Sequence, residues 1–384
     1  MSEKLKNHHG RRQSLGIYMH VPFCKSRCAY CDFISSIDSF AQRRKYVEYL
    51  QRQIDIAAEK YGEKYNVDTL YMGGGTPTLL DSSQLKGITD KIYKGFQCNL
   101  REFTAEANPC TVDNEKLTAL KDCGVGRLSI GVQSFDNALL KMLGRRHDAE
   151  EAKRAVKLAK SYGFDVSVDA MIGLPGQNTS DIRDFIELAA DMDVDHISVY
   201  MLSVERGTAL DKNIKEGKLS AKSDDEIADD YQYACEKLGK NGYYRYEISN
   251  FCRDGKVSYH NLRYWQRCDY LGLGMGAHSL IGDERWRNAE TFDEYYNAID
   301  NLDYRFDVEP LSAEEKESEF IMLNFRLTNG IDFAQFTKKF GNNFLIKYKS
   351  AIDKNKYYLQ ITSKNISIKY EYLQLMNSIA VDFI

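Results

Sequence analysis

Alternation of short strand-like runs with helical stretches constrains the fold of this chain more than any other feature of its sequence. Six runs rich in apolar and β-branched residues recur across the first half, each followed by a stretch of helical periodicity. The runs cover residues 16–21, 69–72, 102–107, 128–132, 166–172 and 196–202. Strand-then-helix units in series predict right-handed crossovers around a parallel sheet. Six units fit either a doubly wound sheet or an incomplete barrel, and both remain open at this point.

The second half of the chain has a different pattern. Residues 204–300 are less regular, with one helix expected over 224–240 and an aromatic stretch after it. From residue 301 the pattern predicts short helices over 313–327, 333–340 and 344–353, then a hairpin of 357–361 with 366–368 and a last helix. This order is typical of a small winged-helix-like α+β domain. We therefore divide the chain into a polar tail (1–14), a barrel (15–203), a closing region (204–300) and a C-terminal domain (301–384).

Charge argues against nucleic-acid binding, which is the usual role of a winged helix. Residues 301–384 carry 11 Lys and Arg and 11 Asp and Glu, and the whole chain has a formal charge of −4. A structural or partner-binding role therefore fits the C-terminal domain better.

Composition and cysteine usage indicate the compartment. The 384 residues are 43% hydrophobic, enough for a substantial core, and no run approaches about 18 apolar residues. The first fifteen residues are polar and show no secretory signal. Nine cysteines are an odd number, which does not describe a disulfide framework. We expect a cytoplasmic protein without a transmembrane segment and with reduced thiols.

Three of the cysteines form one tight group directly after the first expected strand. Cys24, Cys28 and Cys31 have the spacing C-x3-C-x2-C, so three thiolates can hold one metal centre. A structural zinc ion would require a fourth ligand, for which His20 is the nearest choice, although His20 falls within the strand. An iron–sulfur cube fits three cysteines better, because its fourth iron stays free to bind a substrate.

Polar and glycine-rich segments stand where the other expected strands end. These segments are 73–77, 106–109 and 133–134, together with Asp169 ahead of 172–176. In a barrel the carboxyl ends of the strands meet at one rim, where active sites are built. Glycines in such turns let a ligand approach the backbone closely. Together with the cysteine loop, these four segments therefore predict one functional site at that rim.

With these motifs in place, the sequence resembles the radical S-adenosylmethionine superfamily, within it the oxygen-independent coproporphyrinogen III oxidase-like group. The resemblance rests on the YMHVPFC-x3-C-x-YC run from Tyr18 to Cys31, on GGGTP at 73–77, on Glu106 and on GVQSF at 131–135. It implies a partial (β/α)6 TIM-like barrel with a [4Fe–4S] cluster on Cys24, Cys28 and Cys31. In this family S-adenosylmethionine chelates the open iron, and an electron from the cluster splits it into methionine and a 5′-deoxyadenosyl radical.

The resemblance also implies which residues hold S-adenosylmethionine. Tyr18, Gly74 and Glu106 match positions that bind the first molecule, and Tyr30 matches one that packs near the adenine. Five further residues match positions lining a second S-adenosylmethionine site: Gly75, Thr76, Gln133, Arg145 and Asp169. Carboxylates and amides can bond ribose hydroxyls, and an arginine can hold a carboxylate.

Two departures from the oxidase pattern point to the HemW-type heme chaperone branch of the group. Phe33 stands where the oxidases carry a further cysteine, and only 23 residues precede Cys24, fewer than in the oxidases. The HNxxYW motif of the branch is present as His260, Asn261, Tyr264 and Trp265. The resemblance therefore implies heme as a ligand, acceptor hemoproteins as partners and an electron donor. The alternatives are a coproporphyrinogen III oxidase and, more remotely, a zinc-stabilised scaffold.

The residue types of the motif suit heme. Imidazole is a common axial ligand of heme iron, which makes His260 the expected ligand, with Asn261 orienting its ring. Tyr264 and Trp265 offer apolar faces to a porphyrin. Because the motif lies beyond the sixth strand, we expect a separate site outside the barrel units. Cys252 and Cys268 flank the motif and are the competing iron ligands.

Overall fold

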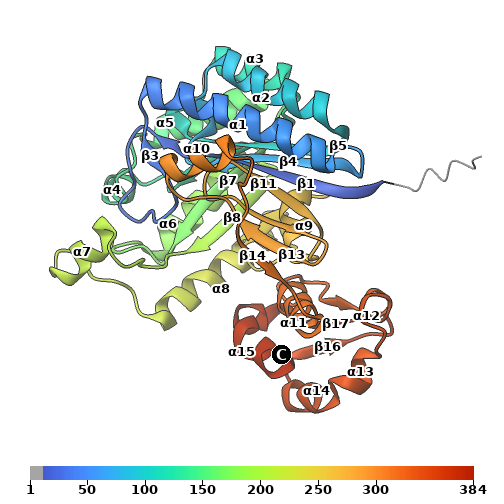
Figure 1. Cartoon of the computed structure of the whole chain (residues 1–384). Helices are drawn as coiled ribbons and strands as arrows, with labels where there is room; N and C mark the ends of the chain where they lie inside the picture. Colours follow the sequence, from blue (N-terminus) through green and yellow to red (C-terminus); the bar gives the residue numbers. More distant parts are fainter. Residues whose placement is uncertain (1–11) are drawn as a thin grey trace, which may run out of the picture.

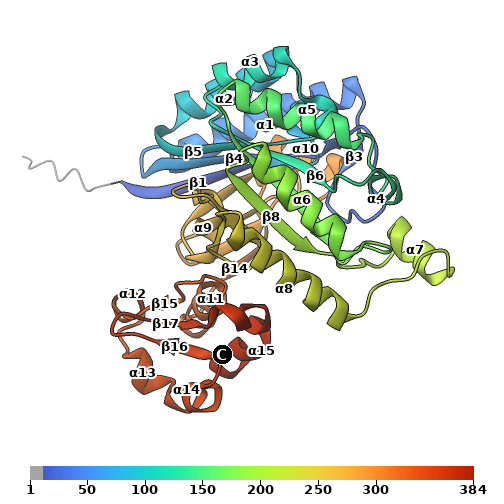
Figure 2. The ribbon, with the colours of Figure 1, turned by 180° about the vertical axis from the view of Figure 1, so that it is seen from behind.

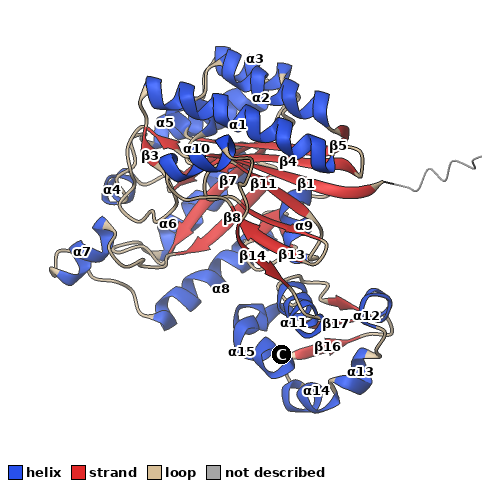
Figure 3. Ribbon diagram, in the orientation of Figure 1, coloured by secondary structure: helices blue, strands red, loops and turns tan. Residues whose placement is uncertain are grey.

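The computed structural model describes residues 12–384, so most of the polar tail expected over 1–14 lies outside the described residues. A twelve-stranded sheet forms the large domain, in the order β14-β13-β12-β11-β1-β4-β5-β6-β7-β8-β10-β9 (Figure 3). Its centre is a run of seven neighbouring parallel strands. In sheet order these are β11 (Tyr270–Leu273), β1 (Gln13–Val21), β4 (Tyr65–Gly74), β5 (Gln97–Ala107), β6 (Arg127–Gln133), β7 (Asp165–Ile172) and β8 (His196–Met201). The expected incomplete barrel is confirmed, and each of the six predicted runs lies in one of these strands.

Helices that follow the strands cover the outer face of this sheet (Figures 1 and 2). They are α1 (Phe40–Tyr61), α2 (Ser82–Gly95), α3 (Asn114–Asp122), α4 (Asn137–Met142), α5 (Ala149–Ser161) and α6 (Thr179–Asp191). Each begins at a side chain that caps its first turn, for example Asn178 before α6. The buried face of α1 contains Val47, Leu50 and Ile54, at the helical spacing that the sequence predicts.

Antiparallel strands extend the sheet at both edges. On one side are β12 (His278–Ile281), β13 (Glu284–Arg287) and β14 (Phe306–Pro310), and on the other are β10 (Asn250–Cys252) and β9 (Tyr244–Arg245). These strands are not predicted from sequence, since each of them is only two to five residues long. A separate parallel pair, β2 (Phe23–Cys24) with β3 (Ser36–Ile37), opens and closes the cysteine loop.

Four helices complete the large domain: α7 (Ala209–Lys215), α8 (Asp224–Lys240), α9 (Tyr259–Trp265) and α10 (Phe292–Asp300). The helix expected over 224–240 is α8. Short 3-10 turns η1 (Pro77–Leu79) and η2 (Pro109–Thr111) follow β4 and β5. Among the described residues, no helix has the length and apolar character that crossing a membrane requires.

The C-terminal domain has its own core below the barrel (Figure 2). It combines the three-stranded sheet β15-β17-β16 with a set of short helices. Its elements are α11 (Ala313–Asn324), β15 (Ile331–Asp332), α12 (Phe333–Phe340), α13 (Phe344–Lys347), α14 (Lys349–Asn355), β16 (Leu359–Ile361), β17 (Asn365–Ile368), η3 (Tyr370–Leu375), α15 (Met376–Ala380) and η4 (Val381–Phe383). Phe320, Phe336 and Phe344 are buried at its centre.

Two details of this domain differ from the expected pattern. The helix expected over 344–353 is interrupted at Tyr348, whose backbone leaves the helical range while its hydroxyl donates to Oε1 of Glu317 at 2.7 Å. In addition, β14 lies beyond residue 301 but pairs with β13 of the large sheet. The core of the small domain therefore starts with α11.

Candidate functional site

The three clustered cysteines lie where β1 ends, on the loop between β2 and β3. Their thiols are half-buried, and two neighbouring side chains donate to them. The Thr76 hydroxyl lies 3.9 Å from Sγ of Cys24, and Nη1 of Arg145 lies 3.3 Å from Sγ of Cys28. Burial raises the pKa of the Cys24 and Cys31 thiols. A cationic partner and a metal centre both favour the thiolate form.

Three thiolates are spaced differently around a single zinc ion and around an iron–sulfur cube. Zinc bonds of about 2.3 Å bring thiolate sulfurs to within about 4 Å of one another. Within residues 12–384, no three His, Cys, Asp or Glu side chains converge closely enough to hold one ion. A cube spreads its ligands over different irons, so its thiolates stand further apart.

His20, the suggested fourth ligand of a zinc site, is not available in this structure. Its Nδ1 lies 3.0 Å from the Tyr18 hydroxyl and its Nε2 lies 2.9 Å from the carbonyl oxygen of Ile34. His20 therefore supports the cysteine loop from inside the barrel through the carbonyl oxygen of Ile34. As a zinc ligand it would have to give up one of these two hydrogen bonds.

Glu106, at the end of β5, accepts two hydrogen bonds at the rim of the barrel. The Gly74 amide donates to Oε2 at 2.9 Å, and the Tyr71 hydroxyl donates to Oε1 at 3.0 Å. Burial, with a smaller contribution from the negative charge of Asp169, raises the pKa of Glu106 to about 7. Gly74 has a φ of 107°, and a Cβ there would come within 2.3 Å of the His20 ring. Only glycine fits this approach between β1 and β4.

A second group of predicted residues gathers around the end of β6. Nη2 of Arg145 donates to the carbonyl oxygen of Gly131 at 2.5 Å, while its Nη1 contacts Cys28. Gln133 is buried with a φ of 69°, which is rare for residues other than glycine and marks local backbone strain. The Ser129 hydroxyl lies 3.5 Å from Oδ1 of Asp169. Arg145 thus joins the cysteine loop to β6 and is not the solvated charge that its sequence context suggests.

The remaining predicted residues are also found at this rim. The amides of Gly75 and Thr76 donate to the carbonyl oxygens of Val21 and Phe23, which joins the glycine-rich turn to the cysteine loop. Burial raises the pKa of Asp169 to about 6. Tyr30 packs beside a small apolar cluster that includes Leu139.

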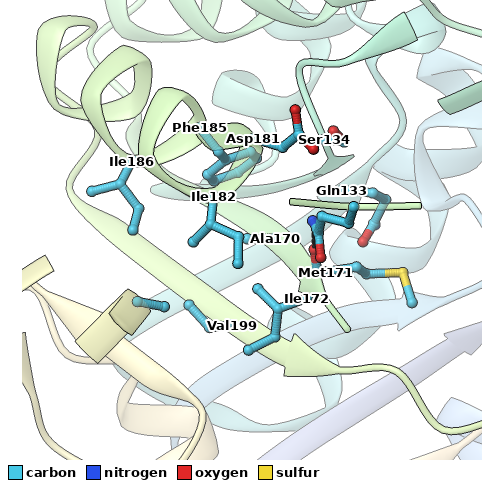
Figure 4. A pocket seen from close by; sticks show the side chains of 12 residues that line it. Gln133, Ser134, Ala170, Met171, Ile172, Asp181, Ile182, Phe185, Ile186 and Val199 are labelled. Atoms are coloured by element: carbon cyan, nitrogen blue, oxygen red, sulfur yellow. Dashed lines mark hydrogen bonds between the residues drawn. The ribbon is translucent and has the colours of Figure 1, made fainter. Parts of the chain in front are cut away.

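The space directly beyond Gln133 is narrow and mostly apolar. It lies between β7 and α6, where Ile182 and Phe185 face Ala170 and Ile172 (Figure 4). Its volume is about 10 Å³, room for little more than one water molecule.

His260 lies inside the barrel and is fully buried. Its Nδ1 is 3.0 Å from the Thr69 hydroxyl of β4, and its Nε2 is 2.9 Å from the Tyr264 hydroxyl one turn later on α9. Its ring stacks on Tyr71. Burial lowers the pKa of His260 to about 3, so the ring is neutral near pH 7.

This position corrects two expectations about the HNxxYW motif. The motif is not a site apart from the barrel, since α9 packs against β4 and β5. Asn261 does not orient the His260 ring, because Thr69 and Tyr264 occupy both ring nitrogens. The aromatic residues of the motif also face different surroundings. Trp265 lies against Arg326 of the C-terminal domain, with the guanidinium carbon 4.1 Å from the centroid of the indole ring.

Cys252 and Cys268, the alternative candidates for the iron ligand, differ in accessibility. Cys252 is fully buried in β10, whereas Cys268 is half-buried after α9. Neither contacts the His260 ring through a hydrogen bond in the described chain.

A cavity of about 780 Å³ separates α9 from the C-terminal domain. Leu262 and Gln266 of α9 line one side, and Asn324, Gln335 and Asn365 line the other. This volume falls in the range of about 300 to 1,000 Å³ that is usual for small-molecule sites. The cavity therefore borders α9, and His260 is not among the residues that line it.

Three residues of this site were missed from sequence. Tyr71 connects Glu106 to His260, and Thr69 holds the His260 ring. Glu102 accepts from the Ser258 hydroxyl and from the amides of Tyr259 and His260, which fixes the start of α9 on β5. The sequence offered no clear signal for Glu102, because β5 holds several other polar residues, including the second carboxylate Glu106.

Two family models match the chain. The model of the Radical SAM superfamily matches residues 18–189, and the model of the HemN C-terminal domain matches residues 311–354. The first covers the strands from β1 to β7 with their helices, and the second begins one residue after β14 ends.

Curated relatives match over most of the length of both chains. The heme chaperone HemW of Bacillus subtilis is 36% identical to this chain, and the match covers 85% of this chain and 87% of the relative. The heme chaperone HemW of Lactococcus lactis is 34% identical, and the match covers 85% of each chain. That of Escherichia coli is 33% identical, covering 84% of this chain and 85% of its own. The solved coproporphyrinogen III oxidase HemN of Escherichia coli, a radical SAM enzyme, has a TM-score of 0.85 over 97% of this chain and 90% of its own. Its 22% identity establishes the fold alone.

Proposed function

Because the chain belongs to the HemW family of radical S-adenosylmethionine proteins, we propose that it is a heme chaperone, which binds heme and transfers it to acceptor hemoproteins. The observation that carries this proposal is the similarity to proteins of that name from three organisms, over more than four-fifths of each chain. The oxidase alternative has only the fold in its support. Phe33, in place of the oxidases' further cysteine, also argues against it.

For the cofactors, we propose a [4Fe–4S] cluster on Cys24, Cys28 and Cys31, with S-adenosylmethionine beside it. The cluster, when bound, supplies the electron that cleaves S-adenosylmethionine. The half-buried thiols and the Arg145 contact to Cys28 support this assignment. Tyr18, Gly74, Glu106 and Tyr30 would hold the first S-adenosylmethionine, with Glu106 accepting bonds from ribose hydroxyls.

For a second S-adenosylmethionine, the proposed residues are Gly75, Thr76, Gln133, Arg145 and Asp169. Arg145 carries a buried Nε that has no hydrogen-bond partner among the described residues. An anionic group such as a carboxylate would satisfy it. The strained backbone at Gln133 is of the kind that is kept where a ligand is clamped.

For heme, we propose that His260 binds the iron through Nε2. This nitrogen now bonds the Tyr264 hydroxyl, so iron would replace that hydroxyl. Thr69 would keep its bond to Nδ1 and thereby orient the imidazole, as partners of metal-bound histidines usually do. The lowered pKa keeps the ring in the neutral form that metals require. Tyr264 and Trp265 would contact the porphyrin with the faces of their rings.

All nine cysteines of the chain are free thiols in the structure. Reduced thiols are the rule in reducing compartments. We therefore place the protein in the cytoplasm.

Transfer kinetics test the proposed function. Heme-loaded protein is mixed with increasing amounts of apo-myoglobin, and the Soret band of the acceptor is followed by stopped flow. A chaperone that hands heme over by contact transfers it at a rate that rises with acceptor concentration. A rate that is independent of acceptor concentration would show that heme is simply lost to solvent, and would contradict the proposal.

A further inference from the structure

Three buried N–H donors lack an acceptor at the interface between α9 and α11. They are Nε1 of Trp265, Nη2 of Arg267 and Nε of Arg326, and none has a hydrogen-bond partner among residues 12–384. The interface is formed by these residues, since Arg326 lies over the Trp265 ring and Nε of Arg267 donates to Oε2 of Glu319 on α11 at 2.9 Å. Buried donors without an acceptor are rare, because each has lost its bond to water. We call Trp265, Arg267 and Arg326 the donor group.

The charges around the donor group leave a positive excess. Glu319 bridges two arginines, since its Oε1 also lies 2.5 Å from Nη2 of Arg285. Nη2 of Arg326 lies 3.2 Å from Oε2 of Glu247, which is fully buried. Three guanidinium groups therefore share two carboxylates, which leaves an excess of one positive charge among these described groups. Only 9% of the Arg267 side chain is exposed, so water and salt screen this charge weakly.

A carboxylate is the anion that the donor group can bind best. The guanidinium group of arginine is planar, and its N–H bonds match the two oxygens of a carboxylate. Arg267 already holds one carboxylate through Nε and retains Nη2 for a second. The indole N–H of Trp265 adds another donor. The cavity beside α9 reaches this interface, because Gln266, the residue directly after Trp265, lines it. A ligand with a carboxylate therefore has access to the donors.

The donor group belongs to the surroundings of the HNxxYW motif. Trp265 is a member of that motif, and the ring of Tyr264 lies 4.7 Å from the ring of Tyr270, between centroids. Burial raises the pKa of Tyr270, and the charges of Arg285 and Arg267 oppose this rise. Charges act in this way only over short distances. The arginines therefore lie close to the aromatic residues that are proposed to contact the porphyrin.

From the unpaired donors and the positive excess, we propose that the donor group binds a carboxylate of heme and selects heme over porphyrins without free carboxylates. The inference rests on the proposed function, since heme is the ligand proposed for the HNxxYW motif. Heme carries two carboxylates on one edge of an otherwise apolar ring, so contact with the ring alone does not distinguish it from its esters. Nη2 of Arg267 and Nε of Arg326 donate to the carboxylate, while Glu319 keeps Arg267 in position.

Heme dimethyl ester tests the inference on the wild-type protein. Both carboxylates of this compound are methyl esters, so the iron and the ring are retained while the negative charges are lost. We expect the wild type to bind heme at least about tenfold more tightly than the ester. Titration at the Soret band, in one mild detergent buffer for both compounds, measures the two affinities. Equal affinities would overturn the proposal.

A variant of Arg267 tests the residue itself. In Arg267→Gln the affinity for heme should fall by about tenfold or more, whereas the affinity for the ester should change by less than about twofold. The matched control is Arg52→Gln on α1, which also removes an arginine paired with a carboxylate, that of Asp300, and should change neither affinity. Equal losses for heme and ester in Arg267→Gln would show that this arginine supports only the fold, and would overturn its assignment.

Arg326→Lys is a second variant, which keeps the positive charge beside Glu247 and removes Nε. Its affinity for heme should fall several-fold, with the affinity for the ester unchanged. Unchanged heme affinity in both arginine variants would overturn the proposal. A wild type that binds neither compound would contradict the proposed function and this inference with it. A wild type that binds both compounds equally would contradict the role of the donor group alone.

Discussion

The ring of Tyr71 stacks on the ring of His260, with centroids 5.3 Å apart and an angle of 29° between their planes. The hydroxyl of the same tyrosine donates to Oε1 of Glu106 at 3.0 Å. Tyr71 therefore joins the carboxylate proposed to bind S-adenosylmethionine to the imidazole proposed to bind heme iron.

Variants of the His260 partners test the iron ligand. Tyr264→Phe removes the hydroxyl that competes for Nε2, so heme should bind several-fold faster than in the wild type. Thr69→Val removes the bond to Nδ1 and should weaken heme binding by about tenfold. Stopped-flow absorbance at the Soret band measures both. The assignment fails if His260→Ala retains the wild-type spectrum and affinity.

The cysteines near the motif serve as controls for that experiment. Cys252→Ala and Cys268→Ala should leave the heme spectrum unchanged, because Cys252 is buried in β10 and neither thiol contacts His260. A shifted Soret band in either variant would move the iron ligand to sulfur.

Iron analysis tests the cluster. Anaerobically reconstituted wild type should contain about four irons per chain and be brown. Changing Cys24, Cys28 or Cys31 to alanine should abolish the colour. Cys110→Ala, also a half-buried thiol, should not affect it. Stoichiometric zinc in place of iron in the wild type would contradict the assignment.

Titration of Glu106 makes the unliganded protein less stable as the pH rises. The folded state holds a proton up to a pH of about 7, whereas the ordinary pKa of a glutamate is 4.5, so the unfolded chain binds fewer protons between these values. The free energy of unfolding should therefore fall by up to about 3 kcal/mol over this range. Asp169, with a pKa of about 6, acts in the same direction.

Urea unfolding at several pH values checks this dependence. Glu106→Gln should remove the part of the slope that Glu106 contributes, because glutamine keeps the shape of the side chain and does not titrate, while the part from Asp169 remains. If the variant kept the wild-type slope, the titrating group would lie elsewhere.

Removal of Glu102 should loosen α9. Its carboxylate accepts from the Ser258 hydroxyl and from two backbone amides at the start of the helix. Glu102→Ala should cost about 2 to 3 kcal/mol of unfolding free energy, and hydrogen exchange should rise over residues 258–265. Glu48→Ala, an exposed residue of α1, is the control and should cost little. Unchanged exchange in α9 would show that Glu102 does not hold it.

Coproporphyrinogen III should not be converted. We expect no protoporphyrinogen even with reductant and S-adenosylmethionine present, because Phe33 has no thiol to offer. Product formed at about 1 per second or faster would restore the oxidase alternative. Liquid chromatography with fluorescence detection of the oxidised porphyrins measures this directly.

The barrel was predictable from sequence because each of its main strands and helices is specified by residues that are close together in the chain. The strands β1, β4, β5, β6, β7 and β8 show as apolar runs in the sequence. Helix α8 shows its full extent through its capping serine, Ser223, and its helical periodicity. The end of each strand then places Glu106, Gln133 and Asp169 at one rim, since parallel strands share a direction.

The position of the HNxxYW motif was not predictable, because it depends on residues that are distant in the sequence. Helix α9 has only seven residues, too few for a hydrophobic period to show which side faces inward. Its orientation depends on Glu102 and Thr69, which lie more than 150 residues earlier in the chain. The strand β11 was missed for the same reason. Its four residues are too few to show a strand pattern, and they form a strand through pairing with the distant β1.

The pairing of β1 with β11 also sets an order of events during protein synthesis. A strand that begins at Gln13 gains its second neighbour only after Leu273 has been made, although β4 is available early. The same late segment supports the cysteine loop, since the Met275 amide donates to the Tyr46 hydroxyl, which in turn donates to the carbonyl oxygen of His20. Pairings so distant in sequence form slowly. The three thiols therefore emerge from the ribosome long before their supporting strand exists.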